Sequence, residues 1–266
     1  NDALIIDPNK PFLLGSMIHA KTKMCEWKNF DEDKSNLKKK ILDNKKGSSP
    51  YTTLTIFDDP KIHFKSASVW SAEHVKNEDQ KTSKSFEKIK KDKKIKIGYY
   101  SADFRTHAMG HLLVRMFELH DKEKFEIYGF YFGPTIREND NLSKRIIKSF
   151  DKFIDVTSKN DIEVAELSRS IGIDIAVDLM CFTGTHNRFG IFTEKCAPLP
   201  IHFLGYPGTS GSHHINYIIV DKNLTSEDNK KYFSENLIFL PDTYQPNEEE
   251  KKVSEKIFTK KELCLP

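Results

Sequence analysis

The stretch KIGYYSADFRTHAMGHLL, from Lys96 to Leu113, combines a strand, a polar turn and the start of a helix. Its apolar run Ile97–Tyr100 follows several lysines, which is typical of a strand that is covered on both faces. After the turn, apolar residues recur at helical spacing from Leu112 to Phe117. Ligands bind where strands end and helices begin in open α/β sheets. The stretch therefore predicts both a fold class and the position of a site.

The turn within this stretch is rich in side chains that can exchange protons. A carboxylate beside imidazoles can orient or deprotonate a hydroxyl group, and in a polar turn it stays ionised near neutral pH. Alternatively, Asp103 and Thr106 cap the following helix, with Thr106 at the N-cap position. Both roles can coexist, so the turn alone leaves catalysis and capping open. Its polar residues are Ser101, Asp103, Arg105, Thr106, His107 and His111.

Strand-like and helix-like segments alternate along the chain beyond this stretch. Such alternation predicts an α/β fold with a Rossmann-like, doubly wound, mostly parallel sheet and right-handed crossovers. We expect strands at 95–101, 125–132, 153–156, 173–179, 201–205, 217–221 and 237–240. We expect helices at 107–120, 141–150 and 162–171, the last ending at Gly172 in a left-handed C-cap.

Other segments divide the chain into four parts. We expect a helical part over 1–75, a charged linker over 76–94, the Rossmann-like domain over 95–243 and a second linker over 244–266. In the first part, 11–45 is predicted to form a helical hairpin, and Asp59-Pro60 opens a further helix. Residues 259–263 resemble a capped helix. The first helix of the hairpin is expected to pack through Phe12, Leu13, Met17, Ala20, Met24 and Trp27.

Composition excludes several classes of protein. The net charge of +3 over 266 residues is too small to favour nucleic-acid binding. No apolar run is long enough to span a membrane, and the first residues lack the pattern of a secretory signal. The chain reads as the middle of a longer protein. Four widely spaced cysteines without a Cys-x-x-Cys pair argue against zinc or disulfides, so we expect the cytoplasm as the compartment.

Two further loops are candidate sites. The sequence 178–188, DLMCFTGTHNR, repeats the pattern of a strand that ends in an acid, although an ordinary strand end explains it equally well. The sequence 204–211, LGYPGTSG, forms a rigid turn whose exposed amides could approach an oxygen-rich ligand. It lacks the lysine and spacing of a phosphate-binding loop. His213 and His214 read as surface residues with no metal-ligand spacing.

Several motifs in fixed order resemble one family. The runs GYYSADFRTHAMGHLL, FEIYGFYFGP, GIDIAVDL, LGYPGTSG, INYIIVD and YFSENLIFLPDTYQPN are similar to the N-terminal half of the catalytic region of O-linked N-acetylglucosamine transferases. This is glycosyltransferase family 41, which includes SPINDLY-like members. The resemblance extends from about residue 94 to 247. The upstream run DPNKPFLLGSMIHAKTKMCEWKNF resembles the end of the tetratricopeptide (TPR) repeats that precede this region in bacterial members.

The resemblance implies a GT-B architecture, in which two Rossmann-like halves hold UDP-GlcNAc between them. It also implies inverting transfer of N-acetylglucosamine to Ser or Thr hydroxyls of proteins, with no metal or other cofactor, and recruitment of acceptor proteins through the TPR region. The half that chiefly holds the nucleotide would follow residue 266. We therefore expect residues 1–266 to be inactive alone and to bind UDP-GlcNAc weakly.

The same resemblance implies roles for individual residues. Asp103 matches an aspartate proposed to act as base or in a proton relay, and His107 matches the adjacent histidine that faces the donor. The expected substrate-binding residues are Leu204, Gly205 and Pro207 in the loop beside the sugar, Arg188 near the acceptor, and Met109 and His111.

Three positions depart from the family pattern. Met109 stands where animal members have a threonine, and Cys181 replaces a glycine. Tyr51 falls near the place of a linker histidine once proposed as the base, which favours Asp103 for that role.

Two other functions remain open at this point. The chain could be a protein-binding TPR and Rossmann module without catalysis of its own. It could also serve a different nucleotide sugar, because the residues that select the nucleotide and sugar lie mostly in the other half of such enzymes.

Overall fold

The computed structural model describes residues 6–74, 86, 93–184, 186–249 and 255–266. Its centre is a seven-stranded sheet in which every strand pairs in parallel with its neighbours, in the order β3-β2-β1-β4-β5-β6-β7. The parallel, doubly wound sheet predicted from the sequence is confirmed. The strands are β1 (Ile95–Ser101), β2 (Phe125–Tyr131), β3 (Lys152–Asp155), β4 (Ile175–Asp178), β5 (Leu199–His202), β6 (Tyr217–Val220) and β7 (Asn236–Phe239).

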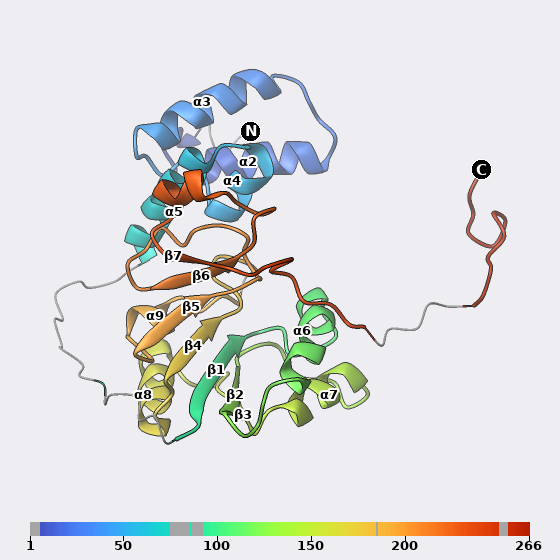
Figure 1. The fold of residues 1–266 in the computed structure, drawn as a ribbon. Coiled ribbons are helices and arrows are strands. Elements are labelled where there is room, and N and C mark those ends of the chain that lie inside the picture. Colours follow the sequence, from blue (N-terminus) through green and yellow to red (C-terminus); the bar gives the residue numbers. More distant parts are fainter. Residues whose placement is uncertain (1–5, 75–85, 87–92, 185, 250–254) are drawn as a thin grey trace.

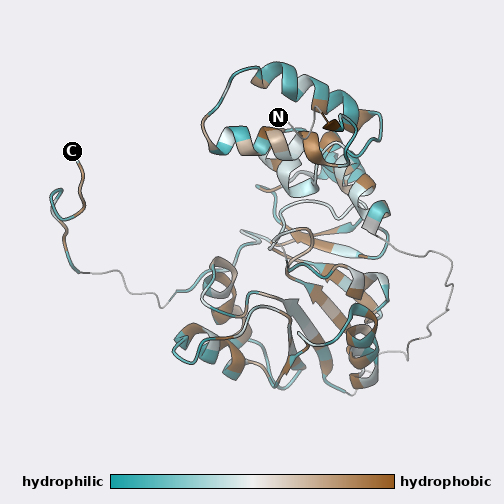
Figure 2. Ribbon diagram, turned by 180° about the vertical axis from the view of Figure 1, so that it is seen from behind, coloured by the Kyte–Doolittle hydropathy of each residue, from teal (hydrophilic) through white to brown (hydrophobic). Residues whose placement is uncertain are grey.

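Helices cover both faces of the sheet. Helices α6 (Ala108–Glu118) and α7 (Asn141–Ser149) lie on one face, and α8 (Asp161–Ile171) and α9 (Gly190–Thr193) lie on the other (Figure 1). Strand β1 shows why both layers form, because its side chains alternate between them. Tyr99 packs into the apolar cluster with Val114 of α6, while Tyr100 packs into the cluster with Val164 of α8. Figure 2 shows hydrophobic residues concentrated along the strands, between these helices.

The direction of winding reverses between β1 and β4. From β1 the chain adds β2 and β3 on one side, and from β4 it adds β5, β6 and β7 on the other. The carboxyl ends of β1 and β4 therefore border the crevice at which ligands of open α/β sheets bind. The turn that follows Ser101 lies at this edge of the sheet.

A helical layer precedes the sheet and lies beside its β7 edge (Figure 1). It consists of α2 (Leu13–Lys23), α3 (Phe30–Leu42), α4 (Pro50–Ile56) and α5 (Pro60–His74). These helices share an apolar core that contains Ile18, Leu37, Ile41 and Ile62. A short 3₁₀ helix, η1 (Glu227–Tyr232), contacts α5 and so joins this layer to the sheet.

The helical hairpin predicted over 11–45 is confirmed, but part of its predicted apolar stripe is wrong. Met24 and Trp27 are 69% and 58% exposed. Helix α2 ends at Lys23, so both residues lie in the turn beyond it and lose the helical register. Ile18, which has no exposed surface, packs in the core from this helix.

The predicted strands and helices of the sheet domain are all found, and most of them have shifted ends. Strand β5 runs from Leu199 to His202 instead of from 201 to 205, and Gly172 has the left-handed φ of 79° expected of a C-cap. The helix predicted at 259–263 is wrong. Thr259 and Glu262 exchange backbone-to-side-chain hydrogen bonds as in a helix start, but the segment forms only turns. All residues in 255–266 are exposed, so too little packing is present to offset the cost of helix nucleation.

Two further observations concern the domain organisation. The charged linker predicted over 76–94 lies largely outside the described residues. In the part of the chain that the structure describes, no helix is long and apolar enough to cross a bilayer.

Candidate active site at the carboxyl edge of the sheet

The carboxylate of Asp103 lies at the centre of the turn that follows β1. The residue is only 8% exposed, and its backbone N–H donates to Ser101 Oγ at 2.9 Å. The Arg105 guanidinium donates to Asp103 Oδ1 at 3.1 Å, and His107 Nδ1 lies 3.5 Å from Oδ2. A partly buried carboxylate with a cation on one oxygen and an imidazole on the other is equipped to accept a proton.

His107 has two possible partners for the same nitrogen. It is the N-cap residue of α6, and its Nδ1 accepts the backbone N–H of Met109 at 3.3 Å. A nitrogen that accepts carries no proton, so in this state the proton of the neutral imidazole is on Nε2. To donate to Asp103 instead, Nδ1 must carry a proton, as it does in the other neutral tautomer and in the imidazolium. The 39% exposure of this side chain leaves it open to a ligand in the crevice.

The prediction that Thr106 caps α6 is wrong, because His107 holds that position. Thr106 instead donates its backbone N–H and its hydroxyl to the two carboxylate oxygens of Asp140, each at 2.8 Å. Asp140 also accepts the backbone N–H of Ser143 and thereby caps α7. Although burial acts in the opposite direction, the hydrogen bonds from Ser143 and Thr106 hold the pKa of Asp140 well below its usual range. Asp103 contacts Arg105 and His107, and the N-cap of α6 is formed by His107 and not by the Asp103 carboxylate.

The loop expected beside the sugar begins with a tight turn against β4. Leu204 has a left-handed φ of 66°, and a Cβ on Gly205 would overlap the carbonyl oxygen of Leu179. Only glycine allows this close approach. The Leu204 side chain is buried in the core on the α6 face, whereas Pro207 is exposed.

The buried carboxylate of Glu235 holds the rest of this loop. It accepts the Ser210 backbone N–H at 2.6 Å, the Ser210 hydroxyl, and the Thr209 hydroxyl at 2.7 Å. Glu235 is 3% exposed and precedes β7, so a residue distant in sequence fixes the loop. Sequence reasoning missed this residue. A charged residue directly before a strand was the available signal, but its partners could not be deduced.

The other expected substrate-binding residues lie around this edge with different degrees of exposure. Met109 is half-buried and His111 exposed, both on the first turns of α6. The Arg188 guanidinium donates to Asp161 at 2.7 Å and to the carbonyl oxygens of Val156 and Lys159 at 3.2 and 2.7 Å. It thus ties its own loop to the segment that joins β3 to α8. Tyr51, expected near the place of a linker histidine, is 47% exposed on α4.

The ends of β4 and β5 bring together three residues that the sequence did not group. Asp178 and His202 stand opposite each other in the parallel register, and Cys181 follows in the turn after β4. All three are buried, and one potential ligand atom from each lies within 4.8 Å of the others. Four cysteines are free, of which Cys181 and Cys196 are buried.

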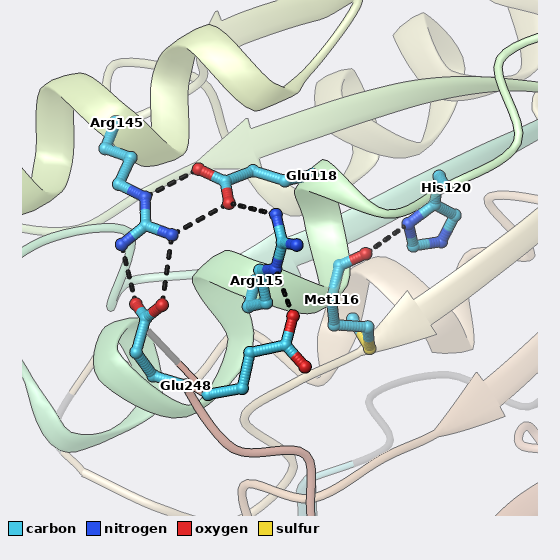
Figure 3. A network of polar contacts seen from close by, with 7 residues as sticks. Arg115, Met116, Glu118, His120, Arg145 and Glu248 are labelled. Carbon is cyan, nitrogen blue, oxygen red and sulfur yellow. Dashed lines mark hydrogen bonds and ion pairs between the residues drawn. The ribbon is translucent and has the colours of Figure 1, made fainter. Parts of the chain in front are cut away.

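A cavity of about 520 Å³ lies elsewhere, at the far end of α6. It is lined in part by His120, Phe125 and Pro246. Because Phe125 begins β2, the cavity is at the amino edge of the sheet, opposite the turn at Asp103. The chain beyond β7 reaches this region. There Glu248 forms a salt bridge with Arg145 of α7, and Arg145 forms a second one with Glu118 of α6 (Figure 3).

Comparison with known proteins identifies the family. The model of glycosyl transferase family 41 matches residues 66–260. A probable UDP-N-acetylglucosamine–peptide N-acetylglucosaminyltransferase SEC of Arabidopsis thaliana is 30% identical over 161 residues, which is 60% of this chain and 16% of the relative. A UDP-N-acetylglucosamine–peptide N-acetylglucosaminyltransferase of Caenorhabditis elegans is 28% identical over 158 residues, covering 59% of this chain and 13% of the relative.

A solved structure supports the fold. An O-GlcNAc transferase mutant from Thermobaculum terrenum superposes with a TM-score of 0.65 at 22% identity, covering 92% of this chain and 46% of that one. The chain therefore spans less than half of that protein and a smaller share of the curated relatives. The family model covers most of the chain, including β1 to β7 and the turn at Asp103. The chain belongs to glycosyl transferase family 41.

Proposed function

We propose that the chain supplies the N-terminal half of the catalytic region of a protein O-GlcNAc transferase. The full-length enzyme would transfer N-acetylglucosamine from UDP-GlcNAc to Ser or Thr hydroxyls of proteins, with inversion and without a metal in the transfer step. The family match and the names of the relatives support this reaction. The observation that carries it is the buried carboxylate of Asp103 beside His107, at the edge where the winding of the sheet reverses.

The geometry supports a division of labour between these two residues. An acceptor hydroxyl in the crevice must lose its proton as its oxygen attacks the sugar. The Asp103 carboxylate, which is paired with Arg105, can accept that proton directly or through His107. Protonation of His107 would release Nδ1 from Met109 N–H and direct it to Asp103. The pair could then hold the proton until the product leaves.

The loop at 204–211 supports a donor-sugar pocket on the same edge. Its backbone packs against the carbonyl oxygen of Leu179 at Gly205 and is held by Glu235 at Ser210. The amides of the loop are therefore in place before a ligand arrives. Such preorganisation favours the transition state because the polar groups need little reordering. Leu204, Gly205 and Pro207 would border the sugar, and Met109 and His111 would approach from α6.

The proposal is tested by Asp103→Asn in the full-length protein. We expect kcat to fall by about 10²- to 10⁴-fold, the usual contribution of a positioned base. Acceptor-peptide binding and the melting temperature should stay unchanged, since the amide keeps the size of the side chain. Asp121→Asn, at the opposite edge of the sheet, is the matched control and should keep full activity. Unchanged turnover in the Asp103 variant would refute the assignment.

Two alternative functions give different outcomes in the same assays. A protein-binding module without catalysis would bind acceptor proteins through the proposed TPR contact. It would transfer no sugar in the wild type or in either variant. An enzyme for another nucleotide sugar would show Asp103-dependent turnover only with that donor. Four unpaired cysteines support a reducing compartment, and we propose the cytoplasm.

A further inference from the structure

The cluster of Asp178, Cys181 and His202 is built by adjacent strands. Asp178 ends β4, His202 ends β5, and the two pair in register. Cys181 lies in the turn that leaves β4. Their exposed fractions are 2%, 0% and 0%, and one ligand atom of each lies within 4.8 Å of the others. Three different metal-ligating side chains therefore face one another in the protein interior.

One oxygen of this cluster has no partner. Asp178 Oδ1 accepts the backbone N–H groups of Met180 and Cys181, each at 2.9 Å, so the turn holds the carboxylate in place. Asp178 Oδ2 is buried and makes no hydrogen bond within the described part of the chain. A buried carboxylate oxygen without a partner is costly, and its presence calls for a ligand at this point.

The hydrogen bonds of His202 leave its second nitrogen open. Nε2 lies 2.6 Å from the carbonyl oxygen of Tyr206, which can only accept, so Nε2 carries the proton. Nδ1 lies 3.4 Å from the carbonyl oxygen of Asp178, a long contact in which a neutral imidazole protonated on Nε2 has no hydrogen to donate. In that neutral form Nδ1 carries a lone pair, which a metal ion could bind after a small rotation of the ring. Metal-bound histidines typically have this arrangement, in which the other ring nitrogen donates to a carbonyl group.

Cys181 is held in a strained backbone conformation. Its φ of 47° is left-handed, which is uncommon for a residue other than glycine or asparagine and is tolerated where the surrounding structure requires it. A divalent cation at this buried place would stabilise the thiolate of Cys181 and the carboxylate of Asp178.

We propose that Asp178, Cys181 and His202 form a metal site that binds Zn²⁺ through three protein ligands. Thiolate, imidazole and carboxylate are the ligands that this ion takes. At bond lengths of about 2.0 to 2.3 Å, tetrahedral ligands lie roughly 3.5 Å apart, so small side-chain rotations close the site. The ion would join the ends of β4 and β5, directly before the turn at Leu204 and Gly205.

The full-length protein, purified from zinc-supplemented cells and passed over chelating resin, tests the proposal. Elemental analysis should find one zinc per chain more in the wild type than in Cys181→Gly. Glycine suits the backbone at this position, so this variant should fold. His202→Gln should lose the same equivalent, whereas Cys196→Ala, which removes a buried thiol outside the cluster, should keep it. Replacement by Co²⁺ should give a thiolate-to-metal charge-transfer band that Cys181→Gly abolishes.

Two results would overturn the proposal. In the first, wild type and Cys181→Gly have the same metal content and no charge-transfer band appears. The three groups would then surround a water molecule, or Asp178 and His202 would form an ion pair. An accompanying rise in melting temperature for Cys181→Gly would show that the left-handed backbone at Cys181 is strained and that no metal compensates for the strain. In the second, the wild type contains zinc that both ligand variants retain, which would place the ion elsewhere in the protein.

Discussion

His107 Nδ1 lies 3.5 Å from the carboxylate of Asp103 and also accepts the backbone N–H of Met109 at 3.3 Å. The imidazole is therefore both the cap of α6 and the neighbour of the proposed base. One side chain thus couples helix stability to proton transfer, and the two roles can be separated by substitution.

The first prediction separates these roles of His107. Asparagine is a favoured N-cap residue, whereas alanine is not. We expect His107→Asn and His107→Ala to lower the turnover of the full-length enzyme equally, by about 10²-fold or more. Only His107→Ala should also lose about 1 kcal/mol of unfolding free energy in urea titrations. Wild-type turnover in His107→Asn would show that capping is the whole contribution of the residue.

The second prediction concerns the acid sensitivity of Asp140. Hydrogen bonds from Ser143 and Thr106 outweigh burial and lower its pKa, so its contribution to stability is present above the unfolded pKa and is lost as the pH falls toward the folded value. Asp140→Ala should cost about 1–2 kcal/mol at neutral pH. The difference from wild type should shrink below pH ~4. Urea unfolding of both proteins from neutral pH to below pH ~4 measures this difference in stability. The exposed Asp58→Asn serves as the control. A stability difference that stays constant over this pH range would contradict the linkage.

The third prediction concerns Glu235 and the loop that it holds. Glu235→Ala leaves the buried Ser210 N–H and its hydroxyl without their acceptor, which should cost about 3 kcal/mol of unfolding free energy. Exposed Glu227→Ala should change stability by less than about 0.5 kcal/mol. Chemical denaturation compares the two variants. Equal stabilities would mean that the loop finds other partners.

The fourth prediction concerns the ion pairs between α6, α7 and the segment after β7. Arg145 contacts Glu118 and Glu248 at 2.6 Å each, and its hydrogen bond lowers the pKa of Glu118. The Arg145 side chain is 35% exposed, so solvent screens the pairs. A double-mutant cycle of Arg145→Met and Glu248→Gln should give a coupling energy of about 0.5–1 kcal/mol that decreases in high salt. A larger, salt-independent value would indicate a desolvated pair.

The fifth prediction concerns donor binding by residues 1–266. Because the proposed enzyme holds UDP-GlcNAc between two halves and chiefly in the other one, calorimetry with this chain should show weak binding without saturation. The longer protein that contains both halves should bind the donor tightly and serves as the comparison. Tight binding by residues 1–266 would place the nucleotide site on this half.

Local patterns were enough to predict the sheet. The runs that form β1, β2 and β4 are buried on both faces, so each of these strands is marked by its own composition, without knowledge of its neighbours. Gly172 was likewise predictable as a C-cap because its requirement is local. The helix predicted at 259–263 failed for the opposite reason. Its capping pattern is present, but short helices depend on packing that these exposed residues lack.

The sequence by itself thus determined the order of the elements, the family and the place of the turn at Asp103, because these depend on residues close together in the chain. Tertiary structure alone decided the partners. Thr106 meets Asp140 instead of capping α6, Ser210 meets Glu235, and Asp178 meets His202. Each pairing depends on strand register and on the packing of distant elements, which no local pattern encodes. The candidate reacting groups belong to one local motif and could be named from it, whereas the side chains that hold this motif in place became visible only in the folded chain.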